Sequence, residues 1–234
     1  MKVNKADEFY KILERKSIYP MFQPIVNLQT GRVSGYEALS RIDRSSTTLT
    51  ISDLFVIAEQ VGCVWKLEKL CRNKALKAGV PASDIVFEIT ERSDIENYQI
   101  LQQIMKHYAD QGYEIALDDV GAGHSGLNRV VNTTPDYLKA DIELVRDIHK
   151  YKKKEIMMKL LLDYCNATGA ILIAEGIETV QELECLHSLG VHYSQGFFLG
   201  KPERAFGNIS AESEEILERL NGRKNILFLD ISGK

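Results

Sequence analysis

Residues 137–175, YLKADIELVRDIHKYKKKEIMMKLLLDYCNATGAILIAE, carry the pattern that decides the fold class. Two short runs of β-type residues, Tyr137–Asp141 and Ile171–Glu175, lie on either side of a segment with helical patterning, Lys152–Asn166. Both runs are apolar on two faces, as in strands of a parallel sheet that helices cover on each side. The stretch therefore predicts a strand, a helix and a second strand of an α/β fold.

The same alternation of strands and helices extends along the rest of the chain. Six further strands are predicted, at Met21–Val26, Gly35–Ile42, Ile85–Thr90, Ile115–Asp119, Tyr193–Leu199 and Ile226–Ile231. Further helices are predicted at Leu54–Ala78, Asn97–Gln111, Val180–Leu189 and Ala211–Leu220, several of them ending near a capping glycine. The turn Gln29-Thr30-Gly31-Arg32 is a hairpin signal, so the first two strands should be antiparallel. The sequence thus predicts a modified TIM (β/α) barrel with an antiparallel first strand, as one domain over residues 1–234.

Charge and hydropathy narrow the classes of partner. The 29 basic and 33 acidic residues give a formal net charge of -4, which offers no broad attraction to nucleic acid or to an anionic membrane. No apolar run approaches the ~18 residues that span a bilayer, and the start, MKVNKADEFYKILERK, lacks the apolar stretch of a signal peptide. The four cysteines have no CxxC spacing and indicate reduced thiols. We expect a cytoplasmic protein without DNA, RNA or membrane as a partner.

The ends of the predicted strands are unusually acidic. Because the carboxyl ends of parallel strands meet at one mouth of a barrel, these side chains should converge. The acids are Glu37, Glu88, Asp118, Asp119 and Glu175. A solvated strand end or a helix cap would account for one of them, but burying five together is tolerable only when cations neutralise them.

Carboxylate oxygens are the ligands that Mg²⁺ and Mn²⁺ prefer, and the adjacent pair Asp118 and Asp119 can flank two ions. Such ions would lower the pKa of a bound water, while Lys139 adds fixed positive charge near a phosphate. The strand ends therefore predict a two-metal site for phosphoryl hydrolysis.

Six sequence blocks carry a resemblance to a known family. They are QPIVNLQTGRVSGYEALSR (23–41), FEITERSDI (87–95), ALDDVGAGHSGL (116–127), PDYLKAD (135–141), ILIAEGIET (171–179) and SQGFFLGKP (194–202). In this order they are similar to the signature blocks of EAL-domain cyclic-di-GMP phosphodiesterases. The resemblance implies cleavage of c-di-GMP to linear pGpG by a water that two ions, Mg²⁺ or Mn²⁺, activate. It also implies a homodimer.

The resemblance further assigns roles to single residues. Glu37, Glu88 and Asp118 match the ligands of the first ion, and Asp119 matches a ligand of the second. Three other sets follow from it: Glu175, Lys139 and Gln195 as residues that bind, activate or order the catalytic water; Gln23, Leu39 and Arg41 as substrate contacts; and Glu91 and Glu178 as residues that brace the loop 120–126, which couples the metal site to dimerisation.

One strand–helix unit of the family is missing. Family members have a strand with an asparagine metal ligand between the EAL and EITE blocks, whereas this chain passes directly from LCRNKALKAG to VPASDIVFEITE. The C-terminal segment NILFLDIS resembles the missing strand, with Asp230 where the asparagine would be. Two hypotheses remain open. The segment fills the vacant position, in its own barrel or a partner's, and presents Asp230 at the mouth; or it is an exposed tail or a strand added elsewhere.

Two function classes compete with a phosphodiesterase. A degenerate EAL domain would bind c-di-GMP or a protein without turnover; the missing asparagine favours this class, but degenerate members lose catalytic acids that this chain retains. A sugar or aldol barrel enzyme would need a different set of strand-end residues. The sequence therefore favours the phosphodiesterase.

Overall fold

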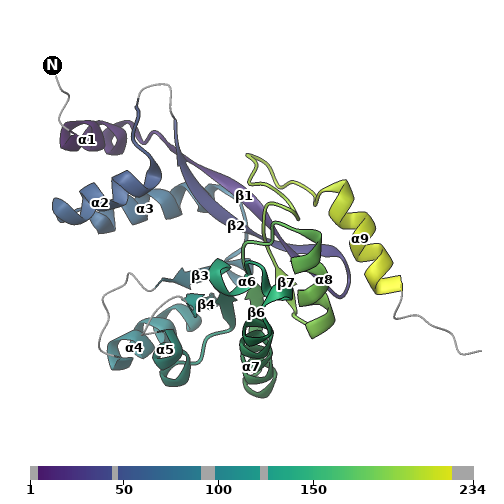
Figure 1. Ribbon diagram of the computed structural model, residues 1–234. Helices are drawn as coiled ribbons and strands as arrows, with labels where there is room; N and C mark the ends of the chain where they lie inside the picture. Colours follow the sequence, from purple (N-terminus) through teal and green to yellow (C-terminus); the bar gives the residue numbers. More distant parts are fainter. Residues whose placement is uncertain (1–4, 44–46, 91–97, 122–125, 223–234) are drawn as a thin grey trace, which may run out of the picture. The chain divides into compact units, whose positions relative to one another are not determined.

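A computed structural model describes residues 5–43, 47–90, 98–121 and 126–222 of the chain (Figure 1). The chain divides into two compact units. Unit 1 comprises Met1–Gln23, Tyr36–Pro81 and Pro202–Gly207, and unit 2 comprises Pro24–Gly35, Ala82–Lys201 and Asn208–Lys234. Strands alternate with helices over most of the described residues, which confirms the α/β class.

The described residues contain seven strands, in the sheet order β2-β1-β7-β6-β5-β4-β3. Their bounds are β1 Ile18–Asn27, β2 Arg32–Ile42, β3 Val86–Ile89, β4 Glu114–Val120, β5 Tyr137–Ala140, β6 Ile171–Ala174 and β7 Tyr193–Ser194. Neighbours from β3 to β7 are parallel, whereas β1 runs antiparallel to β7, with Val26 opposite Ser194. The predicted antiparallel first strand is thereby confirmed. The predicted strand Ile226–Ile231 lies outside the described residues.

A tight turn joins β1 to β2. Asn27 Oδ1 accepts hydrogen bonds from the backbone N–H groups of Gln29 and Thr30, each at 2.9 Å. The N–H of Gly31, which has a φ of +70°, donates to the Asn27 carbonyl at 2.9 Å. An Asx turn followed by a glycine in the left-handed region is the hairpin that the sequence predicts.

The predicted helix Leu54–Ala78 is wrong as a single element. Unit 1 instead has two helices there, α2 (Ile51–Gln60) and α3 (Val64–Ala75), and a 3-10 turn η1 (Leu76–Ala78) follows. Gly62, with a φ of +65°, ends the first helix, and the Cys63 N–H donates to the Ala58 carbonyl. Between α3 and β3 the described residues contain only η1 and a second 3-10 turn at Ala82–Asp84, with no strand, which agrees with the missing strand–helix unit.

Unit 1 has its own apolar core beneath these helices. The helix α1 (Lys5–Arg15) contributes Phe9 and Ile12, which are buried together with Leu54 of α2 and Leu67 of α3. A capping box at Thr50 and Asp53 starts α2, because each side chain accepts from the other residue's backbone N–H. Local capping and one shared core thus hold the helices of this unit.

Unit 2 carries the remaining helices. They are η2 Ala82–Asp84, α4 Tyr98–Ala109, α5 Gly126–Asn132, α6 Ile142–Val145, η3 Ile148–Lys150, α7 Lys152–Thr168, α8 Val180–Leu189 and α9 Ala211–Gly222. The predicted glycine caps are confirmed at Gly169 and Gly190, which end α7 and α8 in the left-handed conformation. Within the described ranges, none of the helices combines the length and apolar character that a bilayer crossing requires.

The predicted strand Tyr193–Leu199 is shorter in the structure, where β7 ends at Ser194. Gly196 packs against the backbone of Ile177, and a Cβ added there would lie 2.2 Å from the Ile177 nitrogen. The Phe198 N–H donates to the Ile177 carbonyl at 3.1 Å, and Gly200 N–H donates to the Gly196 carbonyl. The glycines of GFFLG therefore fold this segment into a turn instead of a longer strand.

The stability of unit 2 should depend on pH through His192. Its Nδ1 accepts from the Leu172 N–H at 3.1 Å, so the ring proton lies on Nε2, 3.1 Å from Asn166 Oδ1. Burial lowers the pKa of this imidazole below its ordinary value. Because the unfolded chain then binds the proton more tightly, this contribution to stability is complete above about pH 6.5 and shrinks as pH falls.

We therefore expect the free energy of unfolding to fall between pH 7 and pH 5 more steeply for the natural chain than for a His192→Gln variant. Urea titrations at each pH would measure the two slopes. Equal slopes would contradict a neutral, half-buried His192.

Candidate metal centre

A buried lysine lies at the centre of the acidic strand ends in unit 2. Lys139, on β5, has only 1% of its side chain exposed. Its Nζ lies 2.7 Å from Glu175 Oε1, 2.9 Å from Glu88 Oε1 and 3.3 Å from Asp118 Oδ1. An ammonium this deeply buried requires charged partners, and here they come from β3, from β4 and from the residue that follows β6. The structure thus brings together four of the predicted site residues.

A bulge in β4 places two adjacent aspartates on this site. Leu117 pairs with Leu138 and Val120 with Ala140, so Asp118 and Asp119 together oppose the single residue Lys139. Asp119 has a φ of +58°, which is uncommon for a residue other than glycine. In a regular strand neighbouring side chains point to opposite faces, and the bulge removes that restriction.

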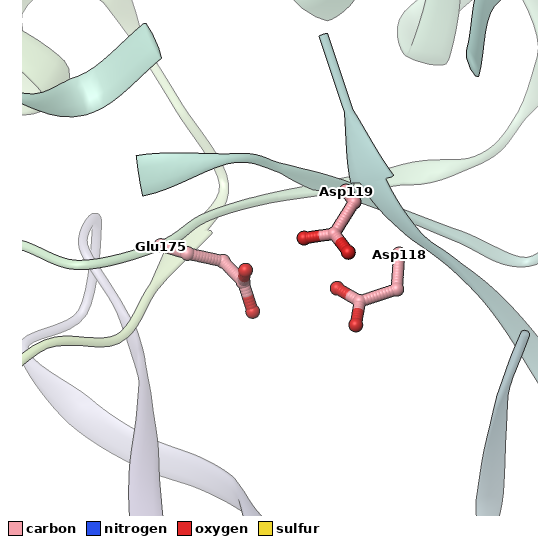
Figure 2. Close-up of side chains that lie close together, drawn as sticks. All are labelled: Asp118, Asp119 and Glu175. Carbon is pink, nitrogen blue, oxygen red and sulfur yellow. The ribbon is translucent and has the colours of Figure 1, made fainter. Parts of the chain in front are cut away.

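The carboxylates of Asp118, Asp119 and Glu175 point into one space (Figure 2). One oxygen from each lies within 4.8 Å of the others. Lys139 pairs with Glu88, Asp118 and Glu175, and Asp119 adds a fourth carboxylate, so the acids in this cluster of described residues outnumber its ammonium group. This donor set fits a hard divalent cation such as Mg²⁺ or Mn²⁺, because it offers oxygen ligands and an unbalanced negative charge.

Crowding of carboxylates in this cluster makes it unfavourable to ionise Asp119. Its pKa is raised above the ordinary value, first by desolvation and then by the negative charges of Asp118 and Asp141. Lys139 acts in the opposite direction without cancelling the rise. A divalent cation would favour the ionised form of this carboxyl group.

Gln195 holds Glu175 in place. Its Nε2 donates to Glu175 Oε1 at 3.0 Å, the oxygen that also faces Lys139. Backbone hydrogen bonds fix both residues to the parallel strands, since the Gln195 N–H donates to the Ala174 carbonyl and the Glu175 N–H to the Ala140 carbonyl. The predicted neighbourhood of Gln195, Glu175 and Lys139 is therefore present.

Asp141 is a member of this cluster that the predicted site left out. It is 9% exposed, and its carboxylate accepts from the Glu143 N–H at 2.7 Å and so caps α6. Its charge and hydrogen bond both act on Asp119. Its position at the end of the strand block YLKAD is the signal that could have included it.

The predicted residues of unit 1 lie on β1 and β2. Glu37, Leu39 and Arg41 alternate along β2 and so share one face, while Gln23 is buried on β1. Arg41 lines a cavity of about 360 Å³. The other residues lining it are Tyr19, Ile42, Leu49, Thr50 and Ile51. That these residues join the cluster of unit 2 stays a prediction.

Three predictions concern the loop and the C-terminal segment. Glu91, Asp230 and residues 122–125 of the loop lie outside the described residues. Glu178 makes a bidentate ion pair with Arg146, with oxygen–nitrogen distances of 2.5 and 2.9 Å. Its role in bracing the loop stays a prediction.

A family profile described as the EAL domain matches residues 6–80 and 66–202. Residues 66–80 fall within both matched ranges. The two matched ranges together extend from residue 6 to residue 202, which is most of the chain.

Curated relatives and solved structures of the same family also resemble this chain. A protein of Escherichia coli named "Probable cyclic di-GMP phosphodiesterase PdeB" is 28% identical over 228 residues, 81% of this chain and 43% of its own length. An EAL domain protein from Listeria monocytogenes has a TM-score of 0.75 at 21% identity, covering 87% of this chain and 95% of that one.

A Klebsiella pneumoniae protein, BlrP1, solved as a manganese and c-di-GMP complex, has a TM-score of 0.67 at 27% identity, covering 82% of this chain and 58% of its own. The chain spans between about a quarter and a half of the length of the first curated relatives it matches. The profile match and the shared fold lead to one conclusion: this chain belongs to the EAL domain family.

Proposed function

We propose that this protein hydrolyses c-di-GMP to linear pGpG with two divalent ions, Mg²⁺ or Mn²⁺. The observation that carries the proposal is the convergence of Asp118, Asp119 and Glu175 within 4.8 Å beside the buried Lys139. The curated relatives named as c-di-GMP phosphodiesterases support the choice of substrate. We also propose that residues 1–234 act as one EAL-type domain, in a cytoplasmic homodimer.

The proposed roles follow the geometry of the cluster and the family resemblance. Glu37, Glu88 and Asp118 would hold one ion, and Asp119 the other. Bound ions would lower the pKa of a coordinated water and offset the charge of the phosphodiester. Glu175 keeps one orientation because Lys139 and Gln195 both donate to its Oε1.

The remaining roles are those of substrate binding and of the loop. Gln23, Leu39 and Arg41 would contact c-di-GMP, with Arg41 supplying positive charge to a phosphate. Glu91 and Glu178 would brace the loop 120–126. The net charge of -4 makes a nucleic acid polymer an unfavourable partner.

One observation favours a binding module without turnover. Between α3 and β3 the described residues contain only the 3-10 turns η1 and η2, so they have no strand at the place where the family has its asparagine ligand. Such a module would bind c-di-GMP and leave it intact. Incubation with c-di-GMP and Mg²⁺ or Mn²⁺, with separation of pGpG by chromatography, distinguishes the two.

A matched variant makes that comparison specific. Asp119→Asn keeps the size of the side chain but replaces one carboxylate oxygen by an NH₂ donor, and so removes a charge from the metal cluster. We expect the variant to fold as the natural chain does, by circular dichroism, and to form little pGpG. Calorimetric binding of c-di-GMP by the natural chain, with no pGpG formed, would instead support the binding module.

Calcium separates binding from turnover. We expect Ca²⁺ to bind the cluster but to support little hydrolysis, because its larger radius and looser coordination do not suit a two-ion geometry adapted to Mg²⁺ or Mn²⁺. Rates of pGpG formation in each metal, at saturating concentrations found by titration, would test this. Equal rates with Ca²⁺ and Mg²⁺ would contradict the proposed geometry.

A further inference from the structure

Arg129, on helix α5 of unit 2, is a buried cation that no step of the proposed mechanism uses. Its side chain belongs to a residue that is 9% exposed, and among the described residues no other arginine is buried. Its Nη1 donates to the backbone carbonyl of Thr90 at 2.9 Å. A buried guanidinium group needs acceptors for its N–H groups, so the site of this contact indicates which element Arg129 acts on.

Thr90 follows directly on β3, the strand that carries Glu88. The pairing of β3 with β4 covers four residues, and its last pair is Ile89 with Leu117. Close to this point the Glu88 carboxylate meets Lys139 Nζ at 2.9 Å. Because the ends of secondary-structure elements open most easily, the position of Glu88 depends on what holds the residue at which the pairing stops. The bond from Arg129 is made there.

Helix α5 gives this contact a fixed origin. The hydroxyl of Tyr164, on α7, donates to the Val130 carbonyl at 2.9 Å, and Val130 is buried in the core of unit 2. Gln102, on α4, donates through its Nε2 to the Asn132 carbonyl at 2.6 Å, and Figure 1 shows α4 and α5 side by side. The helix is therefore tied to two others, and Arg129 connects it to the end of β3.

We propose that Arg129 is a positioning residue for Glu88, a role that rests on the proposed function of the metal centre. By holding the Thr90 carbonyl, Arg129 keeps the carboxyl end of β3 where the Glu88 carboxylate meets Lys139 and can bind a divalent ion. Its bond is to a backbone oxygen, so Arg129 acts through Glu88 and is not itself a catalytic residue. Groups that orient a metal ligand contribute to metal affinity although they do not touch the ion.

The direction of the effect on metal affinity separates positioning from charge. A positive charge repels a divalent cation, so removing the charge of Arg129 would by itself strengthen Mn²⁺ binding. Loss of positioning would weaken it. Arg129→Met keeps much of the apolar stem and removes the charge and the donors. We expect its Kd for Mn²⁺, measured by calorimetry, to rise about tenfold.

The matched control is Gln102→Met. It removes a hydrogen bond that α5 receives from α4 and leaves the bond between Arg129 and Thr90 in place. A general loosening of α5 would affect both variants, whereas the positioning of Glu88 is lost only in Arg129→Met. We therefore expect Gln102→Met to bind Mn²⁺ as the natural chain does. Mn²⁺ binding that is weakened equally in both variants, or tightened in Arg129→Met, would overturn the proposal.

Hydrogen exchange measures the same role in the metal-free protein. The amides of β3 should exchange about tenfold faster in Arg129→Met than in the natural chain, because the end of the strand loses a hydrogen bond from a charged donor. Amides of β5 and β6 should keep their rates and report that the variant is folded. Arg129→Lys keeps the charge with fewer donors and gives the same comparison in a milder form. Unchanged exchange of β3 in both variants would overturn the proposal.

A double-mutant cycle tests whether Arg129 acts through Glu88. Glu88→Gln removes the carboxylate that Arg129 is proposed to position, so adding Arg129→Met to it should change the Mn²⁺ affinity little. An equal loss of affinity with and without the Glu88 carboxylate would contradict the proposed route. A natural chain that binds Mn²⁺ but forms no pGpG would reject the proposed hydrolysis alone, since the cycle and the exchange rates still decide the role of Arg129.

Discussion

Replacement of Lys139 by methionine is expected to destabilise the protein and to remove phosphodiesterase activity together. The buried Nζ faces Glu88, Asp118 and Glu175, and methionine keeps the apolar stem but removes the charge. Removing one partner from a buried charge network costs about 3 to 5 kcal/mol, because the remaining charges lose their compensation. The carboxylates here are 15 to 29% exposed, so water offsets part of this cost.

The control for this variant is an exposed lysine in the same unit. Lys150 pairs with Asp147 at 2.8 Å, but 58% of its side chain is exposed. Lys150→Met should cost no more than about 1 kcal/mol, as surface ion pairs do. Urea unfolding of both variants would measure the difference. Equal stability losses would show that Lys139 is not the centre of the charge network.

Divalent ions should reduce the penalty of Lys139→Met. Mg²⁺ would supply positive charge to the same carboxylates. We therefore expect the difference in stability between the variant and the natural chain to be smaller with Mg²⁺ than without it. A difference that Mg²⁺ does not change would indicate a packing effect.

Glu37→Ala is expected to reduce the rate of c-di-GMP cleavage by about 100-fold or more while the fold stays intact. Glu37 lies on β2 and is only partly buried, so its removal takes away a proposed anionic metal ligand and little packing. Ser34→Ala, an exposed position on the same strand, is the matched control. Near-normal turnover by Glu37→Ala would remove this residue from the metal shell.

The strands and their direction could be predicted because their signals are local. Apolar runs fixed the places of β3, β4, β5 and β6, and the turn at Gly31 indicated the first hairpin. Two predicted elements had wrong bounds, and in both a glycine ends the element for a reason that depends on the surrounding structure. Gly62 ends α2 inside a continuous helical pattern, and Gly196 shortens β7 because the Ile177 backbone lies against it.

The sequence predicted which residues form the acidic cluster but not the local backbone geometry that positions them. Acids at the carboxyl ends of successive parallel strands must converge, which explains why Glu88, Asp118 and Glu175 meet around Lys139. The bulge at Asp119 could not be foreseen, since it depends on the register of β4 against β5. Periodicity in one strand contains no information about that register.

The most direct test of the proposed hydrolysis is cleavage of c-di-GMP in water enriched in oxygen-18, with Mn²⁺, followed by mass spectrometry. A metal-activated water as nucleophile predicts pGpG with one oxygen-18 in its terminal phosphate, formed by the natural chain and strongly reduced in Glu37→Ala. Intact c-di-GMP recovered from a folded protein that binds both Mn²⁺ and the dinucleotide would contradict the account and identify a binding module.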